Sequence, residues 1–256
     1  MITKSCVSCS SSPGWGSGFV PVPPALAVPG SNLRHSSPSY LTPLACTLRS
    51  LLLHSSQGAL LSSVHETQDQ TPPSPPYCHV CQVGDPVLRS QAAAVDPAAI
   101  TGPEVQKVID NMVKVMRKFE CVGMSAPQVG VPLRILALEY PQKMLEESSP
   151  AAREVRGLSV QPLRIFVNPR LRVLDGRTVL FQEACESITG FSATVPRYLS
   201  VEVSGLNEKG EAVTWQASGW PARILQHEMD HLDGVLYIDR MDSKTFINIK
   251  WPSYNE

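Results

Sequence analysis

A His-Glu-x-x-His pattern stands in the last quarter of the chain, which there reads His227-Glu228-Met229-Asp230-His231. On a helix, side chains four residues apart lie one above the other, so both imidazoles can reach one metal ion. Glu228 then lies beside the open coordination position, where a carboxylate can take a proton from water and pass it to a leaving group. The pattern therefore predicts a catalytic metal site. Asp230 points off the histidine face and is not an expected ligand.

The residues around this pattern favour a buried helix. Pro221 suits a first helical turn, and Gly234 is a natural stop. An apolar stripe is formed by Ile224, Leu225 and Leu232. The alternative is a surface helix that carries two histidines by chance. The apolar flanks argue against it, because a buried helix tolerates such polar residues only where they have partners.

The third ligand must come from elsewhere in the chain, and Cys185 is the candidate. It lies at the end of an expected strand, in the polar run Gln182-Glu183-Ala184-Cys185-Glu186-Ser187. A thiolate would complete a Cys-His-His set and leave the fourth position to water. Spacing alone favours a structural buried cysteine. The pair Cys78 and Cys81 has no second pair with matching spacing, so we interpret it as incidental.

The composition of the whole chain bounds its function. The 256 residues include 22 Lys and Arg against 23 Asp and Glu, so no excess of positive charge points to nucleic acid. Seven cysteines do not form an even disulfide framework, which favours a reducing compartment. No apolar run reaches the length of a membrane span.

The first 76 residues differ in composition from the rest. No Asp or Glu precedes Glu66, while serine and proline are frequent and Lys4, Arg34 and Arg49 are positive. Such a segment cannot bury enough apolar surface to fold alone, and its composition is typical of an organellar transit peptide. We expect residues 1–76 to be a disordered, transit-peptide-like segment with a Pro-rich linker, followed by one folded domain over residues 77–256. An untargeted tail is the less favoured alternative.

The pattern after residue 77 predicts an α+β domain. Thr101 to Glu104 open a core-packing helix whose apolar residues recur at helical spacing up to Phe119. Residues 141–160 are polar and suggest a loop insertion, and turns are expected at Asp175-Gly176 and at 207–210. Strands are predicted at 133–139, 163–167, 171–174, 178–181, 199–203 and 212–215. Many short strands between two helices indicate one domain of short antiparallel strands around the helix that carries the histidines.

A run of small residues, 121–130, separates the first helix from the first strand. Small residues let a backbone approach another strand or a ligand closely. The amide of Gln128 can both donate and accept hydrogen bonds, so Gln128 is either a binding residue or an exposed residue of a tight turn.

Three segments, 123–128, 183–187 and 226–231, resemble in order and separation the three signature motifs of the peptide deformylases. The resemblance covers about residues 80–245, and this conjunction is far more specific than His-Glu-x-x-His alone. Glu186, where many bacterial members carry Leu, is similar to the mitochondrial type of animals. Ala184 departs from the family pattern, which usually has Gly there, and adds a methyl group beside the substrate and the metal loop.

The resemblance implies a peptide deformylase catalytic domain over residues 77–256 that removes the formyl group from N-terminal formylmethionine of chains made in the mitochondrion. It implies that Cys185, His227 and His231 bind one divalent metal ion. Fe2+, Co2+ and Zn2+ all suit a thiolate with two imidazoles, so the ion is not decided. Glu228 would transfer protons, while the side-chain amide of Gln128 and the backbone N–H of Glu186 would stabilise the oxyanion.

The resemblance also implies a substrate site. The backbone at Val122 and Gly123 would pair with the peptide as an added strand, and Ile224 would line the methionine pocket. Three further residues, Gln182, Glu183 and Ala184, are expected to bind substrate. A buried ion pair of Glu183 with Arg197 would support the cysteine loop. The partners implied are N-formylmethionyl nascent peptides near the mitochondrial ribosome in the matrix, without nucleic-acid binding or membrane insertion. A homodimer is a further hypothesis.

Two alternatives remain at this stage. A zincin-type peptidase shares the His-Glu-x-x-His helix but needs a third ligand downstream, where no His follows His231 and only Asp239 and Asp242 stand in an expected terminal strand and turn. A non-catalytic protein that captures N-terminal peptides is the other alternative. The presence of both Gln128 and Glu228 favours catalysis over it.

Overall fold

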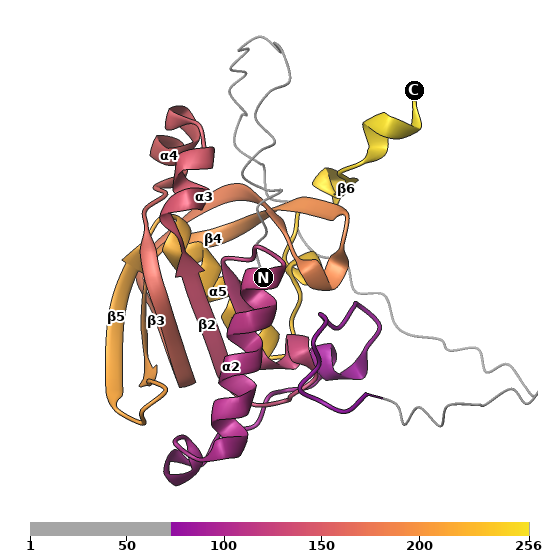
Figure 1. The fold of residues 1–256 in the computed structure, drawn as a ribbon. Coiled ribbons are helices and arrows are strands. Elements are labelled where there is room, and N and C mark those ends of the chain that lie inside the picture. Colours follow the sequence, from indigo (N-terminus) through magenta and orange to yellow (C-terminus); the bar gives the residue numbers. More distant parts are fainter. Residues whose placement is uncertain (1–72, 256) are drawn as a thin grey trace, which may run out of the picture. The chain divides into compact units, whose positions relative to one another are not determined.

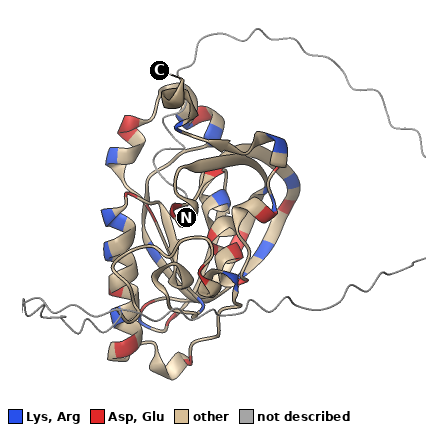
Figure 2. Ribbon diagram, turned by 90° about the vertical axis from the view of Figure 1, so that its right-hand side faces the viewer, with Lys and Arg blue, Asp and Glu red and all other residues tan. Residues whose placement is uncertain are grey.

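The computed structural model describes residues 73–255 (Figure 1). The predicted transit-peptide-like segment lies outside the described residues except for its last four, 73–76. Figure 2 shows positive and negative residues interspersed over the helices and strands of the described part. No helix among residues 73–255 is long and apolar enough to cross a membrane.

A single antiparallel sheet forms the frame of this region and confirms the predicted α+β class. Its strands follow the order β1-β2-β3-β4-β5, and β6 pairs with β4. The bounds of the strands are β1 Gly123–Ser125, β2 Ile135–Tyr140, β3 Gln161–Ala184, β4 Phe191–Leu206, β5 Ala212–Ser218 and β6 Ile247–Asn248. The ladder between β3 and β4 runs from the pair Val167 and Leu206 to the pair Ala184 and Ser192. The end of this ladder delivers Cys185, the next residue after β3.

The predicted turn at Asp175-Gly176 is wrong. Strands expected at 163–167, 171–174 and 178–181 are parts of the one continuous strand β3. The register with β4 shifts on both sides of Asp175, so the turn-forming residues make a bulge instead of ending the strand. Pairing with β4 continues past the bulge and keeps the strand together. The turn at 207–210 is present, with Gly210 at φ +80°.

Helix α2, Pro103–Lys118, begins as predicted, with Gly102 as N-cap and Pro103 in the first turn. The loop predicted for residues 141–160 is wrong, because it contains helices α3, Gln142–Glu147, and α4, Pro150–Arg156. Ser149 caps α4 by accepting a hydrogen bond from the N–H of Ala152, and Gly157 ends it in the left-handed region. Local capping therefore stabilises α4 in a segment whose polarity suggested a loop.

Helix α5, Trp220–Leu232, carries the histidine pattern and packs against strands β1 to β5 (Figure 1). Pro221 lies in its first turn, and Gly234 follows its end at φ +73°. All its residues except Met229 are buried, so polar side chains on it must find partners inside the protein. The terminal strand expected near Asp239 is a 3-10 turn. The 3-10 helices are Pro86–Arg89, Pro97–Ala99, Ala126–Val129, Glu186–Ile188, Tyr237–Asp239, Ser243–Thr245 and Trp251–Tyr254.

Candidate active site

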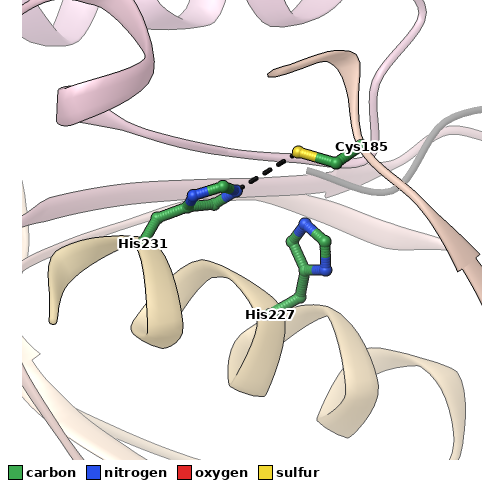
Figure 3. A group of neighbouring side chains, drawn as sticks. All are labelled: Cys185, His227 and His231. Carbon is green, nitrogen blue, oxygen red and sulfur yellow. Dashed lines mark hydrogen bonds between the residues drawn. The ribbon is translucent and has the colours of Figure 1, made fainter. Parts of the chain in front are cut away.

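Three buried side chains meet where the end of β3 faces α5 (Figure 3). The thiol of Cys185, 2% exposed, lies 3.4 Å from Nε2 of His231, and the His227 and His231 rings are 5.0 Å apart between centroids. The candidate ligand atoms of the three residues all lie within 4.8 Å of one another. Within residues 73–255 no other group of His, Cys, Asp and Glu has this spacing. The fold thus brings together the three ligands expected from the sequence.

His227 has one nitrogen engaged and one available. Its Nδ1 lies 2.9 Å from Oε2 of Glu183, which fixes the N–H on Nδ1. Its Nε2 is buried and has no hydrogen-bond partner among the described residues. A buried nitrogen without a partner is costly, and a cation between the two imidazoles and the thiolate would satisfy it. One sulfur and two nitrogens match the protein ligands of a catalytic site with one open position.

The charge of Glu183 is stabilised in the interior. Burial alone would raise the pKa of Glu183, but Arg197 and the hydrogen bond from His227 hold that pKa well below its usual range. Burial would lower the pKa of Arg197, and the carboxylates of Glu183 and Asp230 raise it above its ordinary value instead. Burial lowers the pKa of His231 well below its ordinary value. His231 is therefore neutral near pH 7, the form in which imidazole binds metals.

Glu228 is fully buried and held by β1. The hydroxyl of Ser125 lies 2.8 Å from Oε2 of Glu228 and 2.9 Å from its main-chain oxygen. A Cβ at Gly123 would lie 2.5 Å from Oε1 of Glu228 and 2.7 Å from Cγ2 of Ile224. Only glycine leaves room for these atoms, so the observed orientation of the Glu228 carboxylate requires glycine at position 123.

The side chain of Gln128 is buried and oriented toward the cysteine. Its Oε1 accepts a hydrogen bond from the N–H of Ser125 at 2.9 Å, so its NH2 group faces the other way. That group lies 3.6 Å from the sulfur of Cys185 and 3.2 Å from the hydroxyl of Ser187. The alternative of an exposed residue in a tight turn is wrong, since Gln128 is 0% exposed.

The expected ion pair of Glu183 with Arg197 is present, and two further residues hold the same carboxylate. Arg197 donates to both oxygens of Glu183 at 3.0 Å, and Arg223 donates to Oε1 at 2.7 Å. With His227 on Oε2 and 0% exposure, the carboxylate has no surface left for a substrate. The carboxylate of Glu183 instead orients the ring of His227 through Nδ1.

The other residues expected to bind substrate lie in or next to strands β1 and β3 and in helix α5. Val122, Ala184 and Ile224 belong to one buried apolar cluster, and Gly123 lies in β1. The amide of Gln182 donates to the hydroxyl of Ser192 at 2.7 Å. Glu186 is partly buried at the start of the 3-10 helix after Cys185, and burial raises its pKa.

Three contributors, Ser125, Ser187 and Arg223, were not predicted from the sequence. A signal existed for Arg223, which stands in the apolar run Ala222-Arg223-Ile224-Leu225 of a helix expected to be buried. A buried guanidinium requires a carboxylate partner. No comparable signal distinguished the two serines, whose roles depend on neighbours distant in the sequence.

Comparison with known proteins agrees with this geometry. The family model described as polypeptide deformylase matches residues 77–246. The mitochondrial peptide deformylase of Homo sapiens is 57% identical over 185 residues, which cover 72% of this chain and 76% of the human protein. Peptide deformylase 1A, chloroplastic/mitochondrial, of Arabidopsis thaliana is 47% identical over 166 residues, or 64% of this chain and 61% of that protein.

Solved structures show the same fold. The Met-Ala-Ser-bound class I type b peptide deformylase of Acinetobacter baumannii has a TM-score of 0.56 and 29% identity, over 63% of this chain and 96% of that one. A zincin-type peptidase is not supported, since Cys185 joins the histidines while Asp239 pairs with Arg89. The family match and the relatives confirm the resemblance drawn from the three motifs. The chain belongs to the polypeptide deformylase family.

Proposed function

We propose that Cys185, His227 and His231 hold the divalent metal ion of a peptide deformylase, which removes the formyl group from the N-terminal formylmethionine of newly made polypeptides. The observation that carries the proposal is the buried Nε2 of His227, which has no hydrogen-bond partner in the described structure and lies beside a thiol and a second imidazole. A divalent cation bound there would act as a Lewis acid, lowering the pKa of water and polarising the formyl oxygen. Fe2+, Co2+ and Zn2+ each suit this donor set.

Glu228 is proposed as the acid and base of the reaction. Its carboxylate takes a proton from the attacking water, whose oxygen bonds to the formyl carbon. The same carboxyl group then gives that proton to the departing amine as the carbon–nitrogen bond breaks, and formate leaves. The hydroxyl of Ser125, 2.8 Å from Oε2, holds the carboxylate in one orientation throughout.

The oxyanion of the tetrahedral intermediate needs hydrogen-bond donors in place before the reaction. We assign the NH2 group of Gln128 and the backbone N–H of Glu186 to this role. Support comes from the bond between Ser125 N–H and Oε1 of Gln128, which turns the NH2 group toward Cys185.

We propose that the peptide binds along β1. This strand is the first in the sheet order, and within residues 73–255 it pairs with β2 alone, so its other edge can accept an added strand at Val122 and Gly123. Ile224 and Ala184 pack in the same buried apolar cluster as Val122. We place the methionine side chain of the substrate against this cluster, with residues Gln182 to Ala184 beside it.

We propose that the enzyme works in the mitochondrial matrix near the ribosome, with residues 77–256 as the catalytic domain and residues 1–76 as the transit segment. The serine-rich, acid-free composition of that segment and the mitochondrial human relative support this location. A homodimer through the strands of the central region is proposed as well. Sedimentation of the purified chain at several concentrations tests it.

Formate release tests the proposed function. The full chain is loaded with Fe2+ or Co2+ without oxygen and given formyl-Met-Ala-Ser, with acetyl-Met-Ala-Ser as the matched control. We expect formate from the formyl peptide and no acetate from the control, and a chelator abolishes the release. A folded, metal-loaded protein that releases no formate contradicts the proposal. It would then be tested as a protein that binds formylated peptides.

A further inference from the structure

We infer that Asp230 is a positioning residue, which together with Arg240 fixes His227 at the metal centre through Arg197 and Glu183. The inference rests on the proposed metal-binding role of His227. Asp230 belongs to the His-Glu-x-x-His segment but lies off the ligand face, and the proposed reaction leaves it without a role. Its contacts supply one.

A chain of ion pairs runs from the protein surface to the metal-site histidine. Arg240 donates from Nε and Nη2 to the two oxygens of Asp230 at 2.8 and 2.9 Å. Oδ2 of Asp230 accepts from Nη1 of Arg197 at 2.6 Å. Arg197 in turn holds both oxygens of Glu183 at 3.0 Å, and Glu183 holds Nδ1 of His227 at 2.9 Å. We name these four residues, Arg240, Asp230, Arg197 and Glu183, the ion-pair chain.

Burial makes this chain a constraint on geometry. The exposed fraction of the side chains falls from 50% at Arg240 to 11% at Asp230, 4% at Arg197 and 0% at Glu183. The guanidinium of Arg197 is planar, so two carboxylates that bind different edges of it fix its position and its plane. Without Asp230, only Glu183 would hold Arg197.

The balance of buried charges also supports a positioning role for Asp230. Glu183 faces two guanidiniums, those of Arg197 and Arg223, at 3.0 and 2.7 Å. Asp230 supplies the second negative charge of the buried group. When that charge is removed, Glu183 is the remaining carboxylate that binds Arg197. Its two oxygens still accept hydrogen bonds from Arg197, Arg223 and His227. We expect Glu183 to shift and the orientation of His227 to loosen.

The outer end of the ion-pair chain opens into a cavity of about 580 Å³, whose lining includes Arg197, Asp230 and Arg240. Water from this cavity can hydrate Asn at position 230, so the variant Asp230→Asn keeps a polar side chain of the same size and is expected to fold. Asp233 provides a matched control on the C-cap of α5. It pairs with Arg134 at the surface, its side chain is 49% exposed, and the ion-pair chain does not include it.

The test measures metal affinity rather than turnover. Cobalt binding to the full chain is titrated against a competing chelator, and the visible absorption of the bound cobalt reports the geometry of its ligands. Asp230→Asn is expected to bind cobalt about 10- to 100-fold more weakly, the range for residues that orient metal ligands, with an altered spectrum. Arg240→Gln is expected to lose about 2- to 5-fold, as a half-exposed ion pair does. Asp233→Asn should match the wild type.

Each outcome decides the inference. Wild-type affinity and spectrum in both Asp230→Asn and Arg240→Gln overturn it while leaving the metal centre intact. Equal weakening by Asp233→Asn also overturns it, because the cause is then the helix charge. If Asp230→Asn does not fold, the folded variant Arg240→Gln decides alone. Wild-type protein that binds no cobalt overturns the metal centre and this inference together.

Discussion

Replacing Gly123 by Ala would add a methyl group where β1 faces Glu228 and Ile224. The new Cβ would lie 2.5 Å from Oε1 of Glu228 and 2.7 Å from Cγ2 of Ile224, whereas ordinary contact begins at 3.4 Å. The carboxylate therefore has to retreat by roughly 1 Å, and the Ile224 methyl by almost as much. Ser125 holds the same carboxylate from its other oxygen, so the displacement also strains that hydrogen bond.

Two effects of different size follow. Overpacking of this kind costs about 1–3 kcal/mol of unfolding free energy, which lowers the melting temperature by roughly 2–12 °C in a domain of this size. A displacement of about 1 Å of a catalytic group costs about 100-fold in rate, or about 2.7 kcal/mol in the barrier. We therefore expect a folded variant whose kcat/KM is reduced about 100-fold.

The assay compares kcat/KM for formyl-Met-Ala-Ser, melting temperature and metal content in Gly123→Ala and in the control Gly176→Ala. Gly176 is exposed within β3, and a Cβ there would meet nothing within 4 Å. The control should keep wild-type activity. Wild-type kcat/KM in Gly123→Ala would refute the claim that this glycine makes room for Glu228. A loss of activity in proportion to lost metal would place the defect in the metal centre instead.

Three further predictions concern the same site. Ser125→Ala removes the hydrogen bond to the carboxylate of Glu228, worth about 1.5–3 kcal/mol, so kcat/KM should fall about 10- to 100-fold with metal content unchanged; unaltered kcat/KM would contradict that role. Because the folded-state pKa of Glu183 lies below its unfolded value, its stabilisation is complete above the unfolded pKa, about 4.3, and is lost as pH falls through the folded pKa. Glu183→Gln should therefore cost about 3–5 kcal/mol in urea unfolding at pH 7, with the gap to wild type shrinking only in strong acid, and a gap that widens in acid would oppose this. Chelation should abolish formate release and lower the melting temperature, and added Co2+ should restore both; activity that survives complete metal removal would speak against the metal centre.

The helix of the site could be predicted because its determinants are local. Spacing of His227 and His231, Pro221 at one end and Gly234 at the other fix its face and its length within a few residues of sequence. The resemblance, carried by three short motifs, then supplied Cys185 and Gln128. The structure places both beside the helix, although they precede it by 35 residues or more.

The course of β3 could not be predicted from local residues. Asp175-Gly176 has the composition of a turn, and the same composition permits a bulge. Pairing with β4 decides between them, and that pairing is invisible in a window of ten residues. Helix α4 is a different case, because its local signals were present in the sequence. Capping residues stand at both of its ends, Ser149 and Pro150 at the start and Gly157 at the end, but the polar composition of the segment led to the prediction of a loop.

The hydrogen-bond partners of the site residues could not be predicted from the sequence either. The carboxylate of Glu183 contacts Arg223 and His227 across 40 and 44 residues, and neither contact was predicted. Ser125 reaches Glu228 across 103 residues. Such contacts follow from the packing of α5 against β1 and β3, which no spacing in the chain expresses.

The most direct test of the central claim compares formate release by the metal-loaded wild type with that of Glu228→Ala. We predict that kcat/KM for formyl-Met-Ala-Ser falls by about 100- to 10,000-fold, which is the contribution of a general acid and base. The variant should retain one metal ion per chain. Activity within tenfold of wild type at equal metal content would contradict the account, because the proton would then be carried by a group other than Glu228.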